Sequence, residues 1–515
     1  MLVIGGGING VAIARECARA GRRTCLVEQL DFAAGTTSRS TRIIHGGLRY
    51  LEQGDFAQVQ ESLRERRRLV QERPHLVHPL EFLLALDEST RRSALSIRAG
   101  LWLYRRIGGA SRSRHSAQAS LERLLDAGRR FSLFSFEDAQ CEFPERLVAE
   151  WLSEMIAAGG TALNHTQALA VKLRQGRAVG VQLRDCLSGK EQSVEAEWII
   201  NASGPWADQI CQSSAISTRH PMIGGVRGSH IVLPKFAGAP EAAVYTEAVD
   251  GRPIFVIPWN DQLLVGTTEV PDQNDPTQVS PSGDEIAYLW RSLQRLFPAA
   301  PITANDIRCA FAGVRPLPYS PEARPLAISR RHYLHDHAED GARGMISVIG
   351  GKLTTAASLA RECAAQIGID VAGSGTLAAA SEDEVNALLA RAADEVAERG
   401  HFSRDVARSM VEWHGRSAQT IAEMARGSSE LRASLCPHTN HIVAEAVYAL
   451  QRECAETLAD ILLRRVPVAL GACWSQECSR EAAQRLAAFA GWDQIQMEKQ
   501  LEEFEAEFAG FLQKQ

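Results

Sequence analysis

Gly5-Gly6-Gly7-Ile8-Asn9-Gly10 stands between an apolar segment, Leu2 to Ile4, and a helical pattern that runs from Val11 to Ala20. A G-x-G-x-x-G loop between a strand and a helix presents backbone N–H groups and the positive end of the helix to a pyrophosphate. The first glycine permits the tight turn, the second lets the backbone approach the pyrophosphate, and the third lets the helix pack on the strand. The stretch therefore predicts a strand, a dinucleotide-binding loop and a helix.

A second apolar segment, Thr24 to Val27, ends in Glu28, 18 residues after Gly10. A carboxylate in this position accepts hydrogen bonds from the ribose hydroxyls of a dinucleotide. Strand, helix and acid thus follow one another in the order that a Rossmann-like unit requires. The spacing of the glycines does not distinguish NAD from FAD.

The composition is typical of a globular protein with large apolar cores: 515 residues, 45% of them hydrophobic, and a formal net charge of -6. This length favours two or three domains. A negative net charge gives no general attraction to nucleic acid, and no run of about 18 apolar residues marks a membrane-spanning helix. We therefore expect no nucleic-acid partner, and any membrane contact should be peripheral.

The eleven cysteines contain no C-x-x-C pair, and no signal peptide precedes the glycine loop. This pattern is typical of reduced, mostly buried thiols in a cytoplasmic protein. Cys473 and Cys478 are the closest pair along the chain, and a metal or a disulfide between them is the minority interpretation. From the sequence we expect no metal site.

A second junction between a strand and a glycine turn lies far downstream. The apolar segment Met345 to Ile349 meets Gly350-Gly351-Lys352, and a helical pattern follows from Leu353 to Ile367. Further strands are predicted at Ala196–Gly204, Ser229–Leu233, Pro253–Pro258 and Gln262–Thr267, and a charged helix at Glu61–Gln71. Ala372–Gly375 is typical of a linker, and the remaining residues show helical periodicity. Two junctions of this kind suggest that distant segments converge on one ligand.

The segment Thr36 to Tyr50 is rich in hydroxyl groups, guanidinium groups and glycines. Hydroxyl and arginine side chains suit phosphate, whereas a solvated polar loop is the alternative interpretation. Three more basic residues lie downstream: Arg315, Arg330 and Lys352. Lys352 follows a buried strand and two glycines, a position that faces the binding site of a doubly wound sheet.

Several stretches resemble the FAD-dependent glycerol-3-phosphate dehydrogenase family. Two of them are family signatures that stand in the expected order and at the expected distance: His45-Gly46-Gly47-Leu48-Arg49-Tyr50-Leu51-Glu52 and Gly350-Gly351-Lys352-Leu353-Thr354-Thr355. The resemblance extends to Glu453–Arg465 in the helical region, so it covers roughly the whole chain.

The resemblance implies an α/β fold with three parts. These are a Rossmann-like FAD-binding domain of the glutathione-reductase/D-amino-acid-oxidase type, a β-rich substrate domain and a C-terminal α-helical domain. The expected boundaries are residues 1–70, 140–215 and 305–372 for the discontinuous FAD-binding domain, 71–139 and 216–304 for the substrate and membrane-facing domain, and 373–515 for the helical domain.

The resemblance also implies oxidation of sn-glycerol 3-phosphate to dihydroxyacetone phosphate, with FAD as cofactor and quinone as electron acceptor. The family pattern places Arg49, Tyr50, Arg330 and Lys352 at the substrate phosphate. It places His230 and Arg315 beside the reacting carbon. Because histidine titrates near neutral pH and arginine stays charged, we expect His230 to act as the base and Arg315 as the electrostatic partner. The implied cofactor contacts are Gly5, Gly7, Asn9, Gly10, Glu28, Thr37, Ser38, Ser40, Thr41, His45, Gly46, Gly47, Ala202, Gly204, Trp206, Gly351, Lys352, Leu353 and Thr354.

The chain departs from the family pattern at Arg227, Phe311 and Ala356-Ala357. The alanine pair replaces a tyrosine and an arginine of the family, which puts strict substrate identity in doubt. Two alternatives stay open: a glycerol-3-phosphate oxidase that uses O2, and a non-catalytic flavin-binding protein.

From Arg91 to Arg114 the sequence carries seven arginines and no acid, interleaved with apolar and aromatic residues. Such a stretch suits an anchor on an anionic membrane surface, and a buried helix with a basic face is the equal alternative. Together with the resemblance, it leads us to expect a protein at the inner face of the cell membrane. A homodimer that forms through the helical domain is a further expectation at the family level.

Overall fold

The computed structural model describes residues 1–52, 54–88, 90, 93–108, 118, 121–248, 250–322, 328–371 and 382–511. Its first layer is a six-stranded sheet in the order β17-β18-β10-β1-β2-β6, in which β1 lies parallel to β10 and β2. Only β17 runs antiparallel to its neighbour. The strands are β1 (Leu2–Ile4), β2 (Cys25–Val27), β6 (Thr161–Leu163), β10 (Ile199–Asn201), β17 (Tyr333–Asp336) and β18 (Met345–Ile349).

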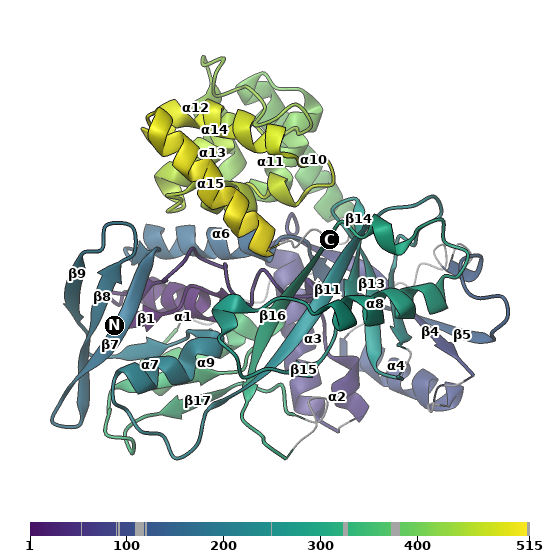
Figure 1. Ribbon diagram of the computed structural model, residues 1–515, viewed down its shortest axis with the longest axis horizontal. Coiled ribbons are helices and arrows are strands. Elements are labelled where there is room, and N and C mark those ends of the chain that lie inside the picture. Colours follow the sequence, from purple (N-terminus) through teal and green to yellow (C-terminus); the bar gives the residue numbers. More distant parts are fainter. Residues whose placement is uncertain are drawn as a thin grey trace.

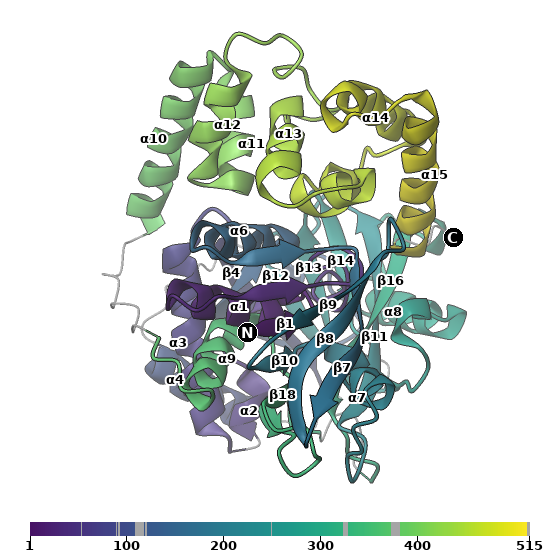
Figure 2. The ribbon, with the colours of Figure 1, turned by 90° about the vertical axis from the view of Figure 1, so that its left-hand side faces the viewer.

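Both faces of this sheet are covered, which explains why its strands are short apolar runs rather than alternating patterns. On one face lie α1 (Ile8–Arg19), α6 (Pro144–Ala157) and α9 (Ala356–Gln366), which pack on one another through a shared apolar core (Figure 2). The other face packs on a three-stranded sheet of β7 (Thr166–Arg174), β8 (Arg177–Asp185) and β9 (Glu191–Glu195), and on α7 (Ala207–Ser213).

A nine-stranded sheet forms the second layer, in the order β15-β11-β14-β13-β12-β4-β5-β3, with β16 paired along β11. Its strands are β3 (Ile43–Ile44), β4 (Val77–Asp87), β5 (Phe131–Cys141), β11 (Ile223–Pro234), β12 (Ala243–Glu247), β13 (Pro253–Trp259), β14 (Gln262–Gly266), β15 (Val270–Pro271) and β16 (Cys309–Pro318). Helix α8 (Gly283–Leu296) covers one face, and α2 (Leu48–Glu52), α3 (Phe56–Glu72) and α4 (Ala94–Gly108) lie near the other (Figure 1). The strands β3 and β16 belong to this sheet, although the boundaries expected from the sequence assign both to the cofactor domain.

The C-terminal helices lie over α6 and the end of the nine-stranded sheet (Figures 1 and 2). They are α10 (Glu382–Gly400), α11 (Arg404–His414), α12 (Ser417–Ala425), α13 (Val443–Arg452), the π-helical turn η6 (Asp460–Arg465), α14 (Gln476–Ala490) and α15 (Gln494–Phe511). Buried ion pairs connect them to the rest: both nitrogens of the Arg465 fork bind Asp31, at 2.6 and 2.8 Å. Arg146 of α6 likewise binds Glu453, at 2.8 and 3.0 Å.

The elements predicted from the sequence are present, with shifted ends. The first helix begins at Ile8, the charged helix extends to Phe56–Glu72, and the strand at Ala196–Gly204 is confined to Ile199–Asn201. The linker at Ala372–Gly375 lies outside the described residues.

The glycine loop is held by contacts too close for any side chain. A Cβ atom on Gly10 would lie 1.9 Å from the carbonyl oxygen of Gly5, and one on Gly5 would lie 2.6 Å from that of Ala202. Gly5 also has a φ of +103°, which disfavours other residues. The loop therefore requires glycine at both positions for packing as well as for conformation.

We expect Gly10→Ala to lower the thermal midpoint of unfolding, because the new methyl group meets backbone that cannot move aside. Overpacking of this kind costs about 1–3 kcal/mol or more. Gly283→Ala at the start of α8 is the matched control, since its methyl group would meet nothing within 4 Å and alanine favours helix by about 0.5–1 kcal/mol. Equal midpoints for the two variants would contradict the packing role of Gly10.

Candidate active site

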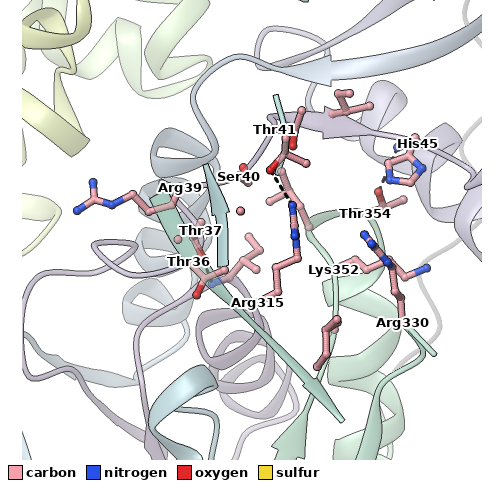
Figure 3. Close-up of a pocket in the computed structure, with 18 of the residues that line it drawn as sticks. Thr36, Thr37, Arg39, Ser40, Thr41, His45, Arg315, Arg330, Lys352 and Thr354 are labelled. Carbon is pink, nitrogen blue, oxygen red and sulfur yellow. Dashed lines mark hydrogen bonds between the residues drawn. The ribbon is translucent and has the colours of Figure 1, made fainter. Parts of the chain in front are cut away.

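A cavity of about 930 Å³ runs along the carboxyl ends of β1, β10 and β18 and reaches the nine-stranded sheet. Its wall combines the glycine loop after β1, the turn after β10, the turn after β18, and side chains from β11 and β16. Figure 3 shows part of this wall, with Arg315 of β16 and Lys352 of the turn after β18. Binding crevices in open α/β sheets lie at the carboxyl ends of the strands. The volume is in the range of cofactor and ligand sites.

At one end of the cavity, Glu28 closes the glycine loop. Its carboxylate accepts hydrogen bonds from the backbone N–H of Gly6 at 2.6 Å and of Leu30 at 2.9 Å. Burial raises its pKa. Glu28 lines the cavity, so the remaining lone pairs of its oxygens are available to ribose hydroxyls.

The two glycine junctions meet at Asn9. Its Nδ2 donates to the carbonyl oxygen of Gly350 at 3.2 Å, and a Cβ atom on Gly351 would lie 2.3 Å from the same nitrogen. Within the described part of the chain, the buried atoms Asn9 Oδ1 and Trp206 Nε1 have no hydrogen-bond partner. Both residues line the cavity, so the protein offers an acceptor and a donor that a polar dinucleotide would satisfy.

The hydroxyl-rich loop contributes to the wall in two ways. Thr37, Ser40 and Thr41 line the cavity, and the Thr37 hydroxyl also accepts the N–H of Ile8 at 3.1 Å. Ser38 instead donates to the carbonyl of Ala33 at 2.6 Å and is buried. It therefore holds the loop in shape rather than facing the cavity.

A cationic group lies beyond the glycine loop. Lys352 and Arg330 lie next to each other below His45 in Figure 3, and Arg315 lines the same cavity. The Lys352 ammonium stands 4.3 Å from the ring centre of Tyr50, which is buried. Burial, with a contribution from the charge of Arg330, lowers the pKa of Lys352 to about 8. A bound anion would reverse this effect, because it favours the charged form.

Arg330 is paired with Glu269, a lining residue that sequence reasoning missed. Nothing in the local sequence marks Glu269, which comes into contact with Arg330 only through the fold. The ion pair fixes the direction of the guanidinium, since a carboxylate holds one edge of the fork.

His230 and Arg315 lie on the neighbouring strands β11 and β16 and both line the cavity. The Nε2 of His230 lies 3.0 Å from the Thr41 hydroxyl, and its ring stacks on Phe311 with 5.1 Å between centroids. Burial, followed by the charge of Arg315, lowers the pKa of His230 to about 3. The imidazole is therefore neutral near pH 7. Arg315 donates to the hydroxyl of Thr267 at 2.9 Å, another residue that the sequence did not indicate.

Most of the residues expected at the site do line this cavity. The exceptions are Gly10, Ser38 and Gly46, which pack beneath it. Gly46 is confined by Leu63 and Tyr104, and its N–H donates to Asp138 at 3.2 Å. The side chain of Arg49 lies outside the described part of the structure, which gives only its place in α2. The departures Ala356 and Ala357 are buried in the core that contains α1 and do not line the cavity.

The comparisons with known proteins agree with this geometry. Residues 1–357 match the model of FAD-dependent oxidoreductases, and residues 346–497 match the C-terminal domain of alpha-glycerophosphate oxidase. A glycerol-3-phosphate dehydrogenase of Synechocystis sp. is 35% identical over 98% of this chain and 95% of its own length. The chain belongs to the FAD-dependent glycerol-3-phosphate dehydrogenase family.

Other relatives show the range of this family. A D-erythritol 1-phosphate dehydrogenase of Brucella abortus is 34% identical over 70% of this chain and 71% of its own length. A crystal structure of glycerol-3-phosphate dehydrogenase from Bacillus halodurans complexed with FAD shares the fold, with a TM-score of 0.77 and 23% identity. That superposition covers 99% of this chain and 94% of the other. The fold class, the enzyme class and the FAD cofactor predicted from the sequence are confirmed.

Proposed function

We propose that this family member oxidises sn-glycerol 3-phosphate at C2 to dihydroxyacetone phosphate and passes the electrons to a membrane quinone. The observation that carries the proposal is the group of Arg315, Arg330 and Lys352 in one cavity with the dinucleotide loop. A small phosphorylated alcohol bound there would lie between the cations and the flavin. The names of the relatives from Synechocystis and Brucella, both polyol-phosphate dehydrogenases, support this substrate class.

The phosphate group would bind to Lys352 and Arg330. Charge-assisted hydrogen bonds of this kind contribute about 1.5–3 kcal/mol each. The Lys352 ammonium lies over the Tyr50 ring, which positions it, and the ion pair with Glu269 positions the Arg330 guanidinium. Arg49 of α2 and the Tyr50 side chain are the other two expected contacts of the phosphate, and both stay predictions.

FAD held along the glycine loop would supply the acceptor for the hydride from C2. The protein must then take the hydroxyl proton and stabilise the charge that develops on the oxygen. His230 is neutral and can take the proton, but its low pKa makes it a weak base. Arg315 therefore carries much of the stabilisation, because its charge sits beside the developing alkoxide. The Thr41 hydroxyl, 3.0 Å from His230 Nε2, holds the ring in position.

The exposed side chains of α4 are the basis for proposing quinone as the electron acceptor. Leu95 and Trp102 are 78% and 67% exposed, and Arg98, Arg105 and Arg106 are exposed with them. Exposed apolar side chains among arginines suit binding to the surface of an anionic bilayer. An enzyme bound there would have access to quinone dissolved in the membrane. The arginines at 91, 92, 112 and 114 lie outside the described residues. No helix within the described ranges is long and apolar enough to span a membrane.

The central test is anaerobic addition of sn-glycerol 3-phosphate to the holoenzyme, followed by the flavin absorbance. We expect the flavin to bleach, and to recover faster with a soluble quinone than with oxygen. D-erythritol 1-phosphate serves as the competing substrate and should bleach it more slowly. Absence of bleaching would favour a binding protein, and faster recovery with oxygen would favour an oxidase. Faster bleaching by D-erythritol 1-phosphate would overturn the substrate assignment.

His230→Gln should slow bleaching by glycerol 3-phosphate about a hundredfold. A variant that bleaches at the wild-type rate throughout pH 6 to 9 would refute the role of His230 as the base.

Lys352 predicts a limit to substrate binding on the alkaline side. The ammonium is charged below its pKa of about 8 and loses its charge above it. Because phosphate monoesters are dianions above about pH 6, kcat/KM for glycerol 3-phosphate should be constant near pH 7 and fall as the pH rises through about 8. Lys352→Arg should remove this fall, since a guanidinium stays charged.

Lys352→Met should raise KM by about tenfold or more at pH 7. Lys235→Met, on the exposed lysine that follows β11, is the matched control and should leave KM unchanged. A fall of kcat/KM above pH 8 that persists in Lys352→Arg would assign the titration to another group.

The α4 surface predicts binding to anionic vesicles. Replacing both Leu95 and Trp102 by serine should weaken co-sedimentation with phosphatidylglycerol vesicles at least about tenfold, because each buried apolar side chain contributes about 1.5–3 kcal/mol. Ile495→Ser, at an 82% exposed residue of α15, is the control for exposed apolar surface elsewhere. Equal binding of wild type and double variant would remove α4 as the anchor.

A further inference from the structure

Three metal-ligating side chains meet in the helical region, away from the cavity. The Sγ of Cys436, a ring nitrogen of His438 and the Sγ of Cys478 all lie within 4.8 Å of one another. Cys436 and His438 lie in the loop before α13, and Cys478 lies in the first turn of α14. None of the three lines the cavity. The proposed oxidation therefore does not use them.

We propose that Cys436, His438 and Cys478 bind a structural zinc ion, with Cys473 as the fourth ligand. The sequence alone, in contrast, led us to expect no metal site. Zinc takes four cysteine or histidine ligands in its structural sites. The cluster offers two thiols and one imidazole, and Cys473 would add a third thiol.

The separation between two of the ligand atoms suits tetrahedral coordination. The Sγ of Cys478 and the Nδ1 of His438 are 3.5 Å apart. Bonds of about 2.3 Å to sulfur and about 2.0–2.1 Å to nitrogen, at the tetrahedral angle, separate two ligand atoms by about 3.6 Å. The pair therefore already lies at the distance that a common zinc ion would impose.

Cys473 lies in the turn before α14 and is exposed, as His438 is. Its carbonyl oxygen is 4.0 Å from the Sγ of Cys478, and its thiol is close enough to Cys436 to interact with it electrostatically. A rotation of this exposed side chain would bring its sulfur to the cluster. The spacing Cys473-x4-Cys478 lies within the range that zinc sites use.

Hydrogen-bond donors surround the two buried sulfurs. The hydroxyl of Ser475, the N-cap of α14, donates to Cys478 Sγ at 3.5 Å. The backbone N–H of His438 donates to Cys436. Metal ligands are oriented by such outer hydrogen bonds, and the N-terminus of a helix favours the thiolate form. Cys436 and Cys478 are 1% and 0% exposed, so the ion would be shielded on the protein side.

The ion would connect two segments about 40 residues apart in sequence. Both pack on one apolar core, through Leu435 beside Cys436 and through Ala482 of α14. A disulfide between Cys436 and Cys478 is the competing use of the same pair, although both are free thiols in this structure. The two uses differ in metal content and in the number of reactive thiols.

The test is the zinc content of the full-length FAD-loaded protein, purified without metal-affinity tag or chelator and measured by elemental analysis. We expect about one zinc per chain. Cys436→Ser and Cys478→Ser should each reduce the content at least fivefold, whereas Cys186→Ser, at the exposed cysteine after β8, should keep it. The ratio of flavin to protein should not change in any variant. Because a serine in the core can impair folding, His438→Gln, at an exposed side chain, is the second variant and should also lose zinc.

Cobalt provides an independent readout. Protein stripped of metal and reduced should take up Co2+ alone and develop a thiolate-to-cobalt absorption band, which Cys436→Ser should lack. Less than a tenth of a zinc per chain together with no uptake of Zn2+ or Co2+ overturns the proposal. A Cys436–Cys478 disulfide found by mass spectrometry in the freshly isolated protein also overturns it. Neither result bears on flavin reduction, so this inference and the proposed oxidation fail separately.

Discussion

The close approach of three backbone turns is the constraint on which the site depends. A side chain on Gly5 would clash with the backbone of Ala202, and a side chain on Gly10 would clash with the backbone of Gly5. These contacts bring the turns after β1 and β10 together, and Asn9 joins them to the turn after β18 through Gly350. A pyrophosphate needs backbone N–H groups at short range, which only turns without side chains provide. The parallel order of the strands delivers all three turns to one edge of the sheet.

The helical region is attached through buried charge rather than through apolar contact alone. Asp31, in the loop after β2, accepts hydrogen bonds from both Arg464 and Arg465. Asp460 accepts a further one from Arg464. The buried carboxylate of Asp460 keeps a pKa below its usual range, because its partners, His165 foremost, outweigh the cost of burial. Breaking such a pair leaves a charge without compensation in the interior, at about 3–5 kcal/mol. The position of the helices over α6 is thereby fixed to the cofactor unit.

Sequence reasoning could locate residues of the cavity wall where one short segment carries the whole signal. The glycine loop, Glu28 and Lys352 are each defined by their neighbours in sequence, and each lies at the cavity. It failed for residues whose contacts form across the fold. Glu269 meets Arg330 from 61 positions away, and Cys436 meets Cys478 across a loop and a helix. Gly46 is a third case. It belongs to a family motif, but it packs against Leu63 and Tyr104 behind the cavity wall instead of lining the cavity.

The charge states of the cavity have a common origin. Burial lowers the pKa of Lys352 to about 8 and of His230 to about 3. A neighbouring cation contributes in both cases, Arg330 for Lys352 and Arg315 for His230. A low-dielectric cavity strengthens repulsion among these groups, and it equally strengthens their attraction to an anion. The free protein thus holds its cations at a cost in stability, and a phosphate or pyrophosphate removes that cost when it binds. A phosphate dianion in the cavity would also raise the pKa of His230, because it would oppose the charge of Arg315, which adds to burial in lowering that pKa.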